Sequence, residues 1–136
     1  MRIMAVDYGD TRTGVAVSDA TGSIVGETWV ITEKNQKKVA QAVSDETEKR
    51  GAVRVVIGLP KNMNGTLGPR AEKSAAFAEL VKTLCACEVI LWDERMTTVS
   101  AQRILSDVGK YGKKRKATID AVAASLILES YLGSIK

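Results

Sequence analysis

The chain has 136 residues, of which 45% are hydrophobic and 26% are charged, and its net charge is +4. This composition is typical of a globular protein and excludes a disordered or fibrous chain, so we predict a single domain over residues 1–136. No apolar stretch is long enough for a membrane span, and no secretory signal pattern is present. We therefore expect a cytoplasmic protein that contacts no membrane and exists as a monomer or weak homodimer.

The absence of histidine limits the possible chemistry. It excludes Ser–His and Cys–His nucleophiles, so any catalysis must use carboxylates, lysines, hydroxyls or a metal ion. Cys85 and Cys87 have no second cysteine pair beside them, which argues against a zinc site and predicts two partly buried reduced thiols.

The first nineteen residues predict an antiparallel hairpin. An apolar run, residues 3–6, ends on Asp7 and breaks at Gly9, and a second run, residues 14–18, ends on Asp19. The first run lacks polar alternation, which indicates a strand covered on both faces. Asp7 then ends a buried strand, where its carboxylate needs either hydrogen bonds from the turn and from Thr11 or Thr13, or a cation.

The remaining elements follow from periodicity and from their end signals. We predict a third strand over residues 22–31, a helix over 35–50 that Gly51 ends, and a strand over 53–57 before Pro60. A helix from Pro69 to about residue 86 and a strand over 88–92 come next. Thr97 or Thr98 is expected to cap a helix that ends at Gly109, and Thr118 to cap a last helix through Leu132.

This order predicts an α/β fold with a five-stranded mixed sheet, three antiparallel strands followed by two parallel ones, flanked by helices. Ligands of such sheets bind beyond the carboxyl ends of the parallel strands. Asp7, Gly58 and the pair Asp93–Glu94 fall at these ends, and Asp120 falls in the first turn of the predicted last helix.

Each acidic residue also has a purely structural interpretation. Asp93, Glu94 and Arg95 can form a surface turn with an internal ion pair, and Asp120 can stabilise the positive end of its helix dipole. Taken together, however, carboxylates in one crevice repel one another and call for a hard divalent cation, Mg²⁺ or Mn²⁺. Such an ion can activate water and polarise a phosphodiester without histidine.

Four segments resemble the YqgF family, whose members are assigned as Holliday junction resolvases and as nucleases that mature pre-16S ribosomal RNA. They are DYGDTRTGVAVSD, VIGLPKNMNGT, the DERMTT run and IDAVAASLILESYL, in the family's order along essentially the whole chain. The resemblance implies a ribonuclease H-like fold with the first strand central. It also implies catalytic acids at Asp7, at Asp93 or Glu94, and at Asp120. We expect Glu94 rather than Asp93 to join Asp7 and Asp120 as metal ligands, although resolvases of the wider fold use four acids.

Two polar segments are candidates for binding nucleic acid. The loop after Pro60, with Lys61, Asn62, Asn64 and nearby Arg70, can contact phosphates or remain solvated. The basic run over residues 110–116, before the last helix, is the stronger candidate for binding nucleic acid, because its charges lie next to Asp120 in the sequence. Further candidate contacts are Arg12, Arg95, Lys110, Lys113, Lys114, Arg115 and Lys116.

We therefore predict a metal-dependent endonuclease that hydrolyses phosphodiester bonds in structured nucleic acid, with precursor 16S rRNA as the expected substrate. The alternatives are a Holliday junction resolvase acting on branched DNA and a non-catalytic nucleic-acid-binding module. A phosphotransferase related to sugar kinases is disfavoured, because those enzymes bind nucleotide between two such domains and 136 residues provide only one.

Overall fold

The computed structural model describes residues 1–97 and 115–135, and at residues 96, 97 and 115–120 it describes the backbone alone. The elements in chain order are β1 (Arg2–Asp7), β2 (Arg12–Ser18), β3 (Val25–Thr32), α1 (Gln36–Arg50), β4 (Ala52–Leu59), α2 (Pro69–Leu84), β5 (Glu88–Asp93), the short 3₁₀ helix η1 (Glu94–Thr97) and α4 (Arg115–Ser134). None of these described helices is both long enough and apolar enough to cross a membrane.

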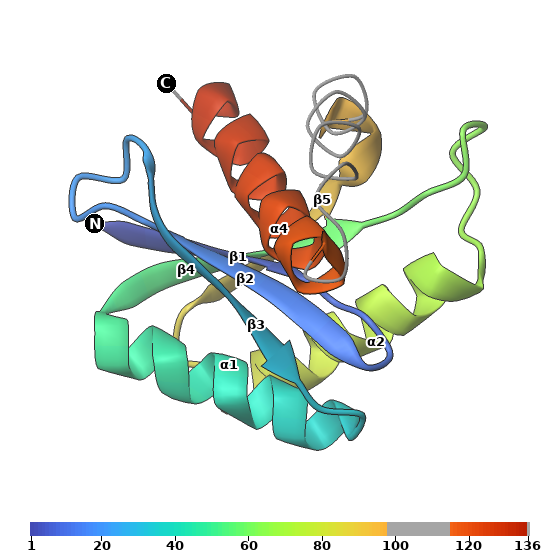
Figure 1. Cartoon of the computed structure of the whole chain (residues 1–136), viewed down its shortest axis with the longest axis horizontal. Coiled ribbons are helices and arrows are strands. Elements are labelled where there is room, and N and C mark those ends of the chain that lie inside the picture. Colours follow the sequence, from blue (N-terminus) through green and yellow to red (C-terminus); the bar gives the residue numbers. More distant parts are fainter. Residues whose placement is uncertain (98–114, 136) are drawn as a thin grey trace.

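The five strands form one mixed sheet in the order β3-β2-β1-β4-β5 (Figure 1). β1 pairs antiparallel with β2 and parallel with β4, while β3 and β5 form the two edges. The predicted mixed sheet is confirmed, and so is the central position of the first strand.

β1 is buried on both faces because its side chains alternate between two cores. Met4 and Val6 point into the core shared with α1 and α2, whereas Ile3 and Ala5 point into the core shared with α4. All four are fully buried. Figure 1 shows α1 and α2 on one side of the sheet and α4 crossing the other. This two-sided cover explains why the first strand reads as a continuous apolar run.

The contacts of α4 fix its direction across the sheet. Near the start of β4, Arg54 donates a hydrogen bond of 2.7 Å from Nη1 to the Tyr131 hydroxyl. Near the end of β4, a Cβ built on Gly58 would lie 2.6 Å from Cδ1 of Ile127. Going back along α4 from Tyr131 to Ile127 therefore leads towards the carboxyl end of β4, so the first half of the helix extends towards that edge of the sheet.

The third strand starts at Val25, three residues later than predicted, because Asp19 organises the chain before it. The carboxylate of Asp19 accepts hydrogen bonds from the Thr21 hydroxyl at 2.7 Å and from the Ser23 amide at 2.9 Å. These two bonds are the main reason that the pKa of Asp19 is lowered to about 2. They hold residues 21–23 in a turn, where a strand ladder cannot begin.

The last helix starts at Arg115, so the prediction that Thr118 caps it was wrong. Arg115, Lys116 and Ala117 are strong helix formers and extend the helix towards its N-terminus. Consequently Asp120 is not in the first turn, which contains no acidic residue. The helix predicted between Thr97 or Thr98 and Gly109 lies outside the described residues.

Cys85 and Cys87 are free, half-buried thiols, as predicted. Burial raises the pKa of the Cys87 thiol, and Cys85 raises it further. The raised pKa of Cys87 fits a structural role of this thiol better than a reactive one.

Two glycines with open space around them should respond oppositely to alanine. Gly51 ends α1 with φ of 69°, a conformation that costs alanine about 1 kcal/mol, whereas Gly133 is helical, where alanine gains up to about 1 kcal/mol. A Cβ at either position meets nothing within 4 Å, so packing does not contribute. Urea unfolding should show a lower midpoint for Gly51→Ala and a higher midpoint for Gly133→Ala. Shifts of the same sign would contradict these backbone assignments.

Candidate active site

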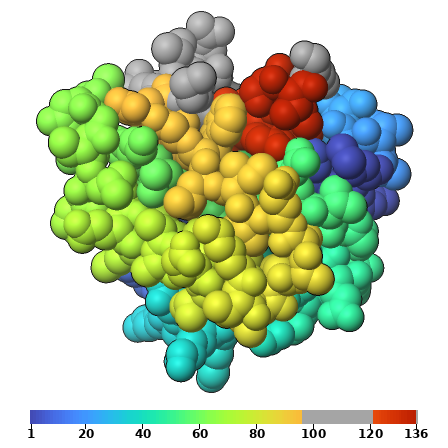
Figure 2. Space-filling view, turned by 180° about the vertical axis from the view of Figure 1, so that it is seen from behind, coloured from blue at the N-terminus to red at the C-terminus, as the bar shows by residue number. Residues whose placement is uncertain are grey.

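The candidate site lies where three neighbouring strands end. Asp7 is the last residue of β1, and Leu59 of β4 pairs with Asp93, the last residue of β5. Since β1, β4 and β5 are parallel, their carboxyl ends share one edge of the sheet. Figure 2 shows the end of β5 and η1 (orange) at the surface between the yellow-green start of α2 and the red α4.

Glu94 occupies the space directly over β4 that Gly58 leaves open. A Cβ on Gly58 would lie 3.0 Å from both Cγ and Cδ of Glu94, and it would also press on Ile127 of α4. The Glu94 side chain is therefore held between β4 and α4, with its Oε2 atom buried. Any side chain at position 58 would have to displace the side chains of Glu94 and Ile127.

The environment of Glu94 favours its protonated form when no cation is present. Burial raises the pKa of Glu94 to about 7, and the negative charge of Asp7 contributes in the same direction. The guanidinium of Arg70 opposes both effects. Asp7 and Glu94 thus form a pair of neighbouring carboxylates that cannot both be ionised cheaply near neutral pH.

Asp93 points to a different partner. Its Oδ2 accepts from Nη2 of Arg95 at 2.6 Å, and its Oδ1 accepts from the backbone amide and Nε of Arg95, both at 3.0 Å. The hydrogen bonds from the Arg95 side chain are the largest cause of the lowered pKa of Asp93. The internal ion pair considered from the sequence is present, and it holds the side chain of Asp93.

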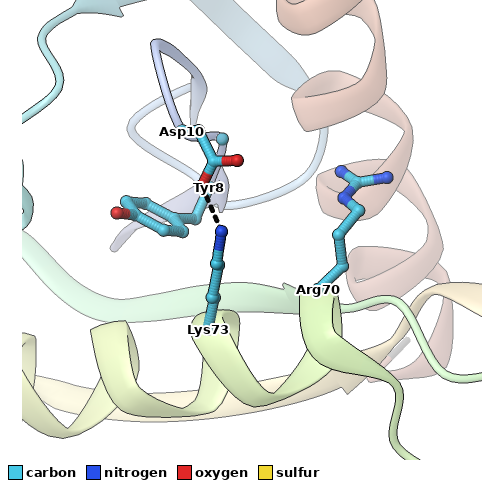
Figure 3. Close-up of a pocket in the computed structure, with 5 residues that line it drawn as sticks. Tyr8, Asp10, Arg70 and Lys73 are labelled. Atoms are coloured by element: carbon cyan, nitrogen blue, oxygen red, sulfur yellow. Dashed lines mark hydrogen bonds and ion pairs between the residues drawn. The ribbon is translucent and has the colours of Figure 1, made fainter.

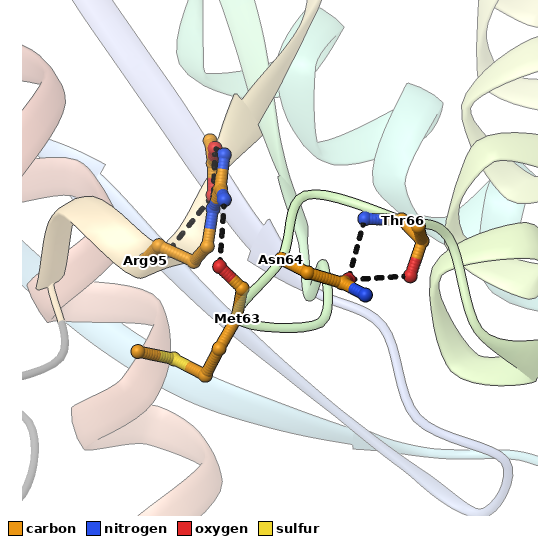
Figure 4. Close-up of polar contacts among 5 residues, drawn as sticks. Met63, Asn64, Thr66 and Arg95 are labelled. Atoms are coloured by element: carbon orange, nitrogen blue, oxygen red, sulfur yellow. Dashed lines mark hydrogen bonds and ion pairs between the residues drawn. The ribbon is translucent and has the colours of Figure 1, made fainter.

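Arg95 also links this corner to the loop over residues 61–68. Its Nη1 donates to the carbonyl oxygen of Met63 at 3.3 Å (Figure 4). Within the loop, Asn64 Oδ1 accepts from the amide of Thr66 at 3.1 Å and from its hydroxyl at 2.7 Å. Asn62 Nδ2 donates to the same hydroxyl at 3.0 Å. Both asparagines, which the sequence predicts to bind nucleic acid, make hydrogen bonds within the loop that hold its shape.

The other predicted binding residues fall into two groups. Arg12 begins β2 beside Thr32, Lys61 is close enough to Asp93 to lower its pKa, and Arg70 is exposed in the first turn of α2. Residues of the basic run fall outside what the structure describes: Lys110, Lys113 and Lys114 entirely, and Arg115 and Lys116 except for their helical backbone. The side chain of Asp120 is outside it too. Among the described side chains, no three Asp, Glu or Cys residues gather closely enough to hold a metal ion.

One feature of this edge escaped the sequence reasoning. A small pocket follows Asp7 and is lined by Tyr8, Gly9, Asp10, Arg70 and Lys73. Lys73 and Asp10 are 63 residues apart in sequence and form an ion pair of 3.1 Å. The signal available in the sequence was the spacing of Arg70 and Lys73, which places two cations one turn apart on a predicted helix.

Comparison with known proteins assigns the family. A family model described as RuvX, Holliday junction resolvase, matches residues 1–134. The chain belongs to this family. It is 44% identical over 137 residues to a relative from Thermoanaerobacter pseudethanolicus named "Putative pre-16S rRNA nuclease", covering 100% of this chain and 99% of the relative. A relative of the same name from Halothermothrix orenii is 43% identical over 132 residues, covering 97% and 94% of the two chains. These matches confirm the resemblance to the YqgF family that the sequence motifs indicated, since RuvX and YqgF name the same family.

A solved structure extends the RuvX assignment to the fold. Thermus thermophilus RuvC in complex with a Holliday junction substrate superposes with a TM-score of 0.64 over 98% of this chain and 96% of that chain. At 14% sequence identity the likeness concerns the fold alone. It confirms the ribonuclease H-like architecture expected for the RuvX chain.

The raised pKa of Glu94 predicts a specific pH dependence of stability. In the folded protein this carboxyl keeps its proton up to about pH 7, whereas the unfolded chain loses it near 4.5, so the free energy of unfolding should fall as pH rises between these values. Glu94→Gln removes that loss. The variant should gain stability relative to the wild type between pH 5 and pH 8, by about 3 kcal/mol at most.

Urea unfolding in EDTA at the two pH values measures this difference. Glu79→Gln, which changes an exposed glutamate of α2, is the matched control and should follow the wild type. If Glu94→Gln also runs parallel to the wild type, Glu94 does not carry a raised pKa.

Proposed function

We propose that this chain is a divalent-metal-dependent endonuclease that hydrolyses phosphodiester bonds in structured nucleic acid, with precursor 16S rRNA as its substrate during ribosome biogenesis in the cytoplasm. The observation that carries the proposal is the Asp7–Glu94 pair, held at the carboxyl edge of the central strands with a raised Glu94 pKa. Membership of a nuclease family supports the same reaction class.

The donor set fits Mg²⁺ or Mn²⁺. Carboxylate oxygens are the ligands that these hard cations prefer, and the chain offers no histidine that would favour a softer metal. A cation between Asp7 and Glu94 would offset their mutual repulsion and stabilise the ionised form of Glu94. When bound, such an ion polarises the phosphodiester and lowers the pKa of attacking water.

The position of Asp120 supports its assignment as the third ligand. It precedes Ala124 by four residues and Ile127 by seven, spacings that place the three positions on one face of a helix. Ala124 and Ile127 pack in the core against the sheet, and Ile127 lies beside Gly58. Position 120 is two turns further towards the carboxyl edge. Because Asp120 is not in the first turn of α4, the helix dipole no longer accounts for an acid there.

Two arginines support the acids of the proposed site. Arg95 holds Asp93, which leaves Glu94 as the acid of this strand end that faces Asp7. Arg70 contributes a positive charge close to Glu94, where a phosphate of the substrate would need one. Three acids, Asp7, Glu94 and Asp120, are then the proposed catalytic and metal-binding set.

The substrate class follows from the family and from charge. Close relatives carry the name of a pre-16S rRNA nuclease, and the net charge of +4 suits a polyanion. A four-way DNA junction, the substrate in the related RuvC complex, is the appropriate comparison substrate.

Asp120→Asn separates chemistry from binding. The change is nearly isosteric and removes one negative charge, so binding to nucleic acid should stay constant or tighten slightly. Cleavage of precursor 16S rRNA with Mn²⁺ should fall by about 100-fold or more, because the cation loses a charged ligand. EDTA should abolish cleavage by the wild type.

Asp45→Asn serves as the control, because it removes an exposed acid from α1, which lies in the layer opposite α4 (Figure 1). It should retain full cleavage. Full cleavage by Asp120→Asn would refute the three-acid site. Efficient cleavage of the four-way junction with no cleavage of precursor rRNA would instead identify a resolvase.

A further inference from the structure

The pocket beside Asp7 has the charge and size of an anion site. It is lined by Tyr8, Gly9, Asp10, Arg70 and Lys73, the first three of which follow Asp7 directly in the chain. In Figure 3, Lys73 extends from α2 to Asp10, and Arg70 extends from the start of the same helix on the other side of the pocket. Its cavity volume of about 60 Å³ is enough for several water molecules and therefore for a phosphate group.

The ion pair at the mouth of this pocket is easily exchanged. Lys73 Nζ lies 3.1 Å from Asp10 Oδ1, and the two side chains are 57% and 72% exposed. Exposed pairs of this kind contribute little to stability, since both charges remain well solvated. A phosphate can therefore replace Asp10 as the partner of Lys73 at small cost.

The pocket adjoins the candidate active site through the chain itself. Tyr8, Gly9 and Asp10 line the pocket and directly follow Asp7, the last residue of β1. A phosphate in the pocket would accordingly lie next to the reacting group, on the side of β1.

The floor of the pocket is rigid. The Tyr8 ring stacks on Phe77 with centroids 4.3 Å apart and an interplanar angle of 15°. Phe77 is fully buried and lies one turn after Lys73 on α2. This packing fixes the loop after β1 against α2, so the spacing between Asp10 and Lys73 is set before any substrate binds.

We propose that Arg70 and Lys73 form a phosphate subsite that holds the phosphodiester adjacent to the scissile one. In this account Asp10 stays paired with Lys73 until a phosphate of the nucleic acid replaces it. The subsite deepens the nuclease function proposed above and rests on it. Asp10 then lowers the affinity of the subsite for small free anions. A polyanion that is also bound elsewhere on the protein competes better with Asp10 for Lys73.

The test measures binding without cleavage. Fluorescence anisotropy of a labelled single-stranded RNA of mixed sequence, recorded in EDTA over a salt series, gives the affinity and its salt dependence. Lys73→Gln should weaken binding and reduce the log–log salt slope by about 0.7. Asp10→Asn should tighten binding about two- to five-fold, the range expected for release of one exposed ion pair. In the Lys73→Gln background the effect of Asp10→Asn should shrink, since the lysine that Asp10 restrains is gone.

The far end of α2 provides a matched control. Lys82 and Glu79 form an exposed ion pair of 3.2 Å on the same helix, so Lys82→Gln and Glu79→Gln change the same charges away from the pocket. They should leave the salt slope nearly unchanged. Equal slopes for Lys73→Gln and Lys82→Gln, additive effects of the Asp10 and Lys73 changes, or no binding of the RNA by the wild type would each overturn the subsite.

The outcome is independent of the cleavage assay. If precursor rRNA is cleaved but Lys73→Gln binds like the wild type, the subsite fails and the nuclease function stands. If Lys73→Gln lowers the slope but no substrate is cleaved, the chain binds phosphate at this pocket without the proposed chemistry.

Discussion

The candidate site depends on one buried carboxylate, Glu94, which lies at the edge of the sheet where β1 ends and is influenced by the charge of Asp7. Asp7 is fixed there because β1 is the central strand, covered by helices on both faces. Glu94 fits over β4 because Gly58 leaves room for its side chain and for that of Ile127. Burial is the main cause of the raised pKa of Glu94 and the charge of Asp7 adds to it, so the folded protein bears an energetic cost that a cation would reduce.

Two arginines partly compensate the carboxylates at this edge, where Asp93 as well as Asp7 raises the pKa of Glu94. Arg95 neutralises Asp93 and attaches the loop over residues 61–68 through the Met63 carbonyl. Arg70 counteracts part of the repulsion at Glu94 and also faces the pocket that Lys73 and Asp10 share. The same edge therefore combines a negatively charged centre with positive groups around it, an arrangement suited to a metal ion and a polyanion together.

The sequence was sufficient for the parts of the fold that periodicity determines. The unbroken apolar run of residues 3–6 placed β1 at the centre, and the strand ends placed Asp7 and the Asp93–Glu94 pair at one edge. It failed at Asp19, whose hydrogen bonds override the local pattern and delay β3. It also failed at Arg115, where the helix propensity of three residues outweighed the capping signal at Thr118. Lys73 and Asp10 could not be paired from the sequence, because only the tertiary fold brings residues 63 positions apart into contact.

The central claim is that Asp7 and Glu94 share a cation, and the titration of Glu94 tests it most directly. Carbon-13 NMR of selectively labelled glutamate side chains follows this carboxyl with and without Mg²⁺, and Glu94→Gln assigns its signal. The account predicts a pKa of about 7 without metal, a marked fall on adding Mg²⁺, and in Asp7→Asn a lower starting pKa with little response to Mg²⁺. A Glu94 that titrates near 4.5 without metal, or that ignores Mg²⁺ in the wild type, would contradict it.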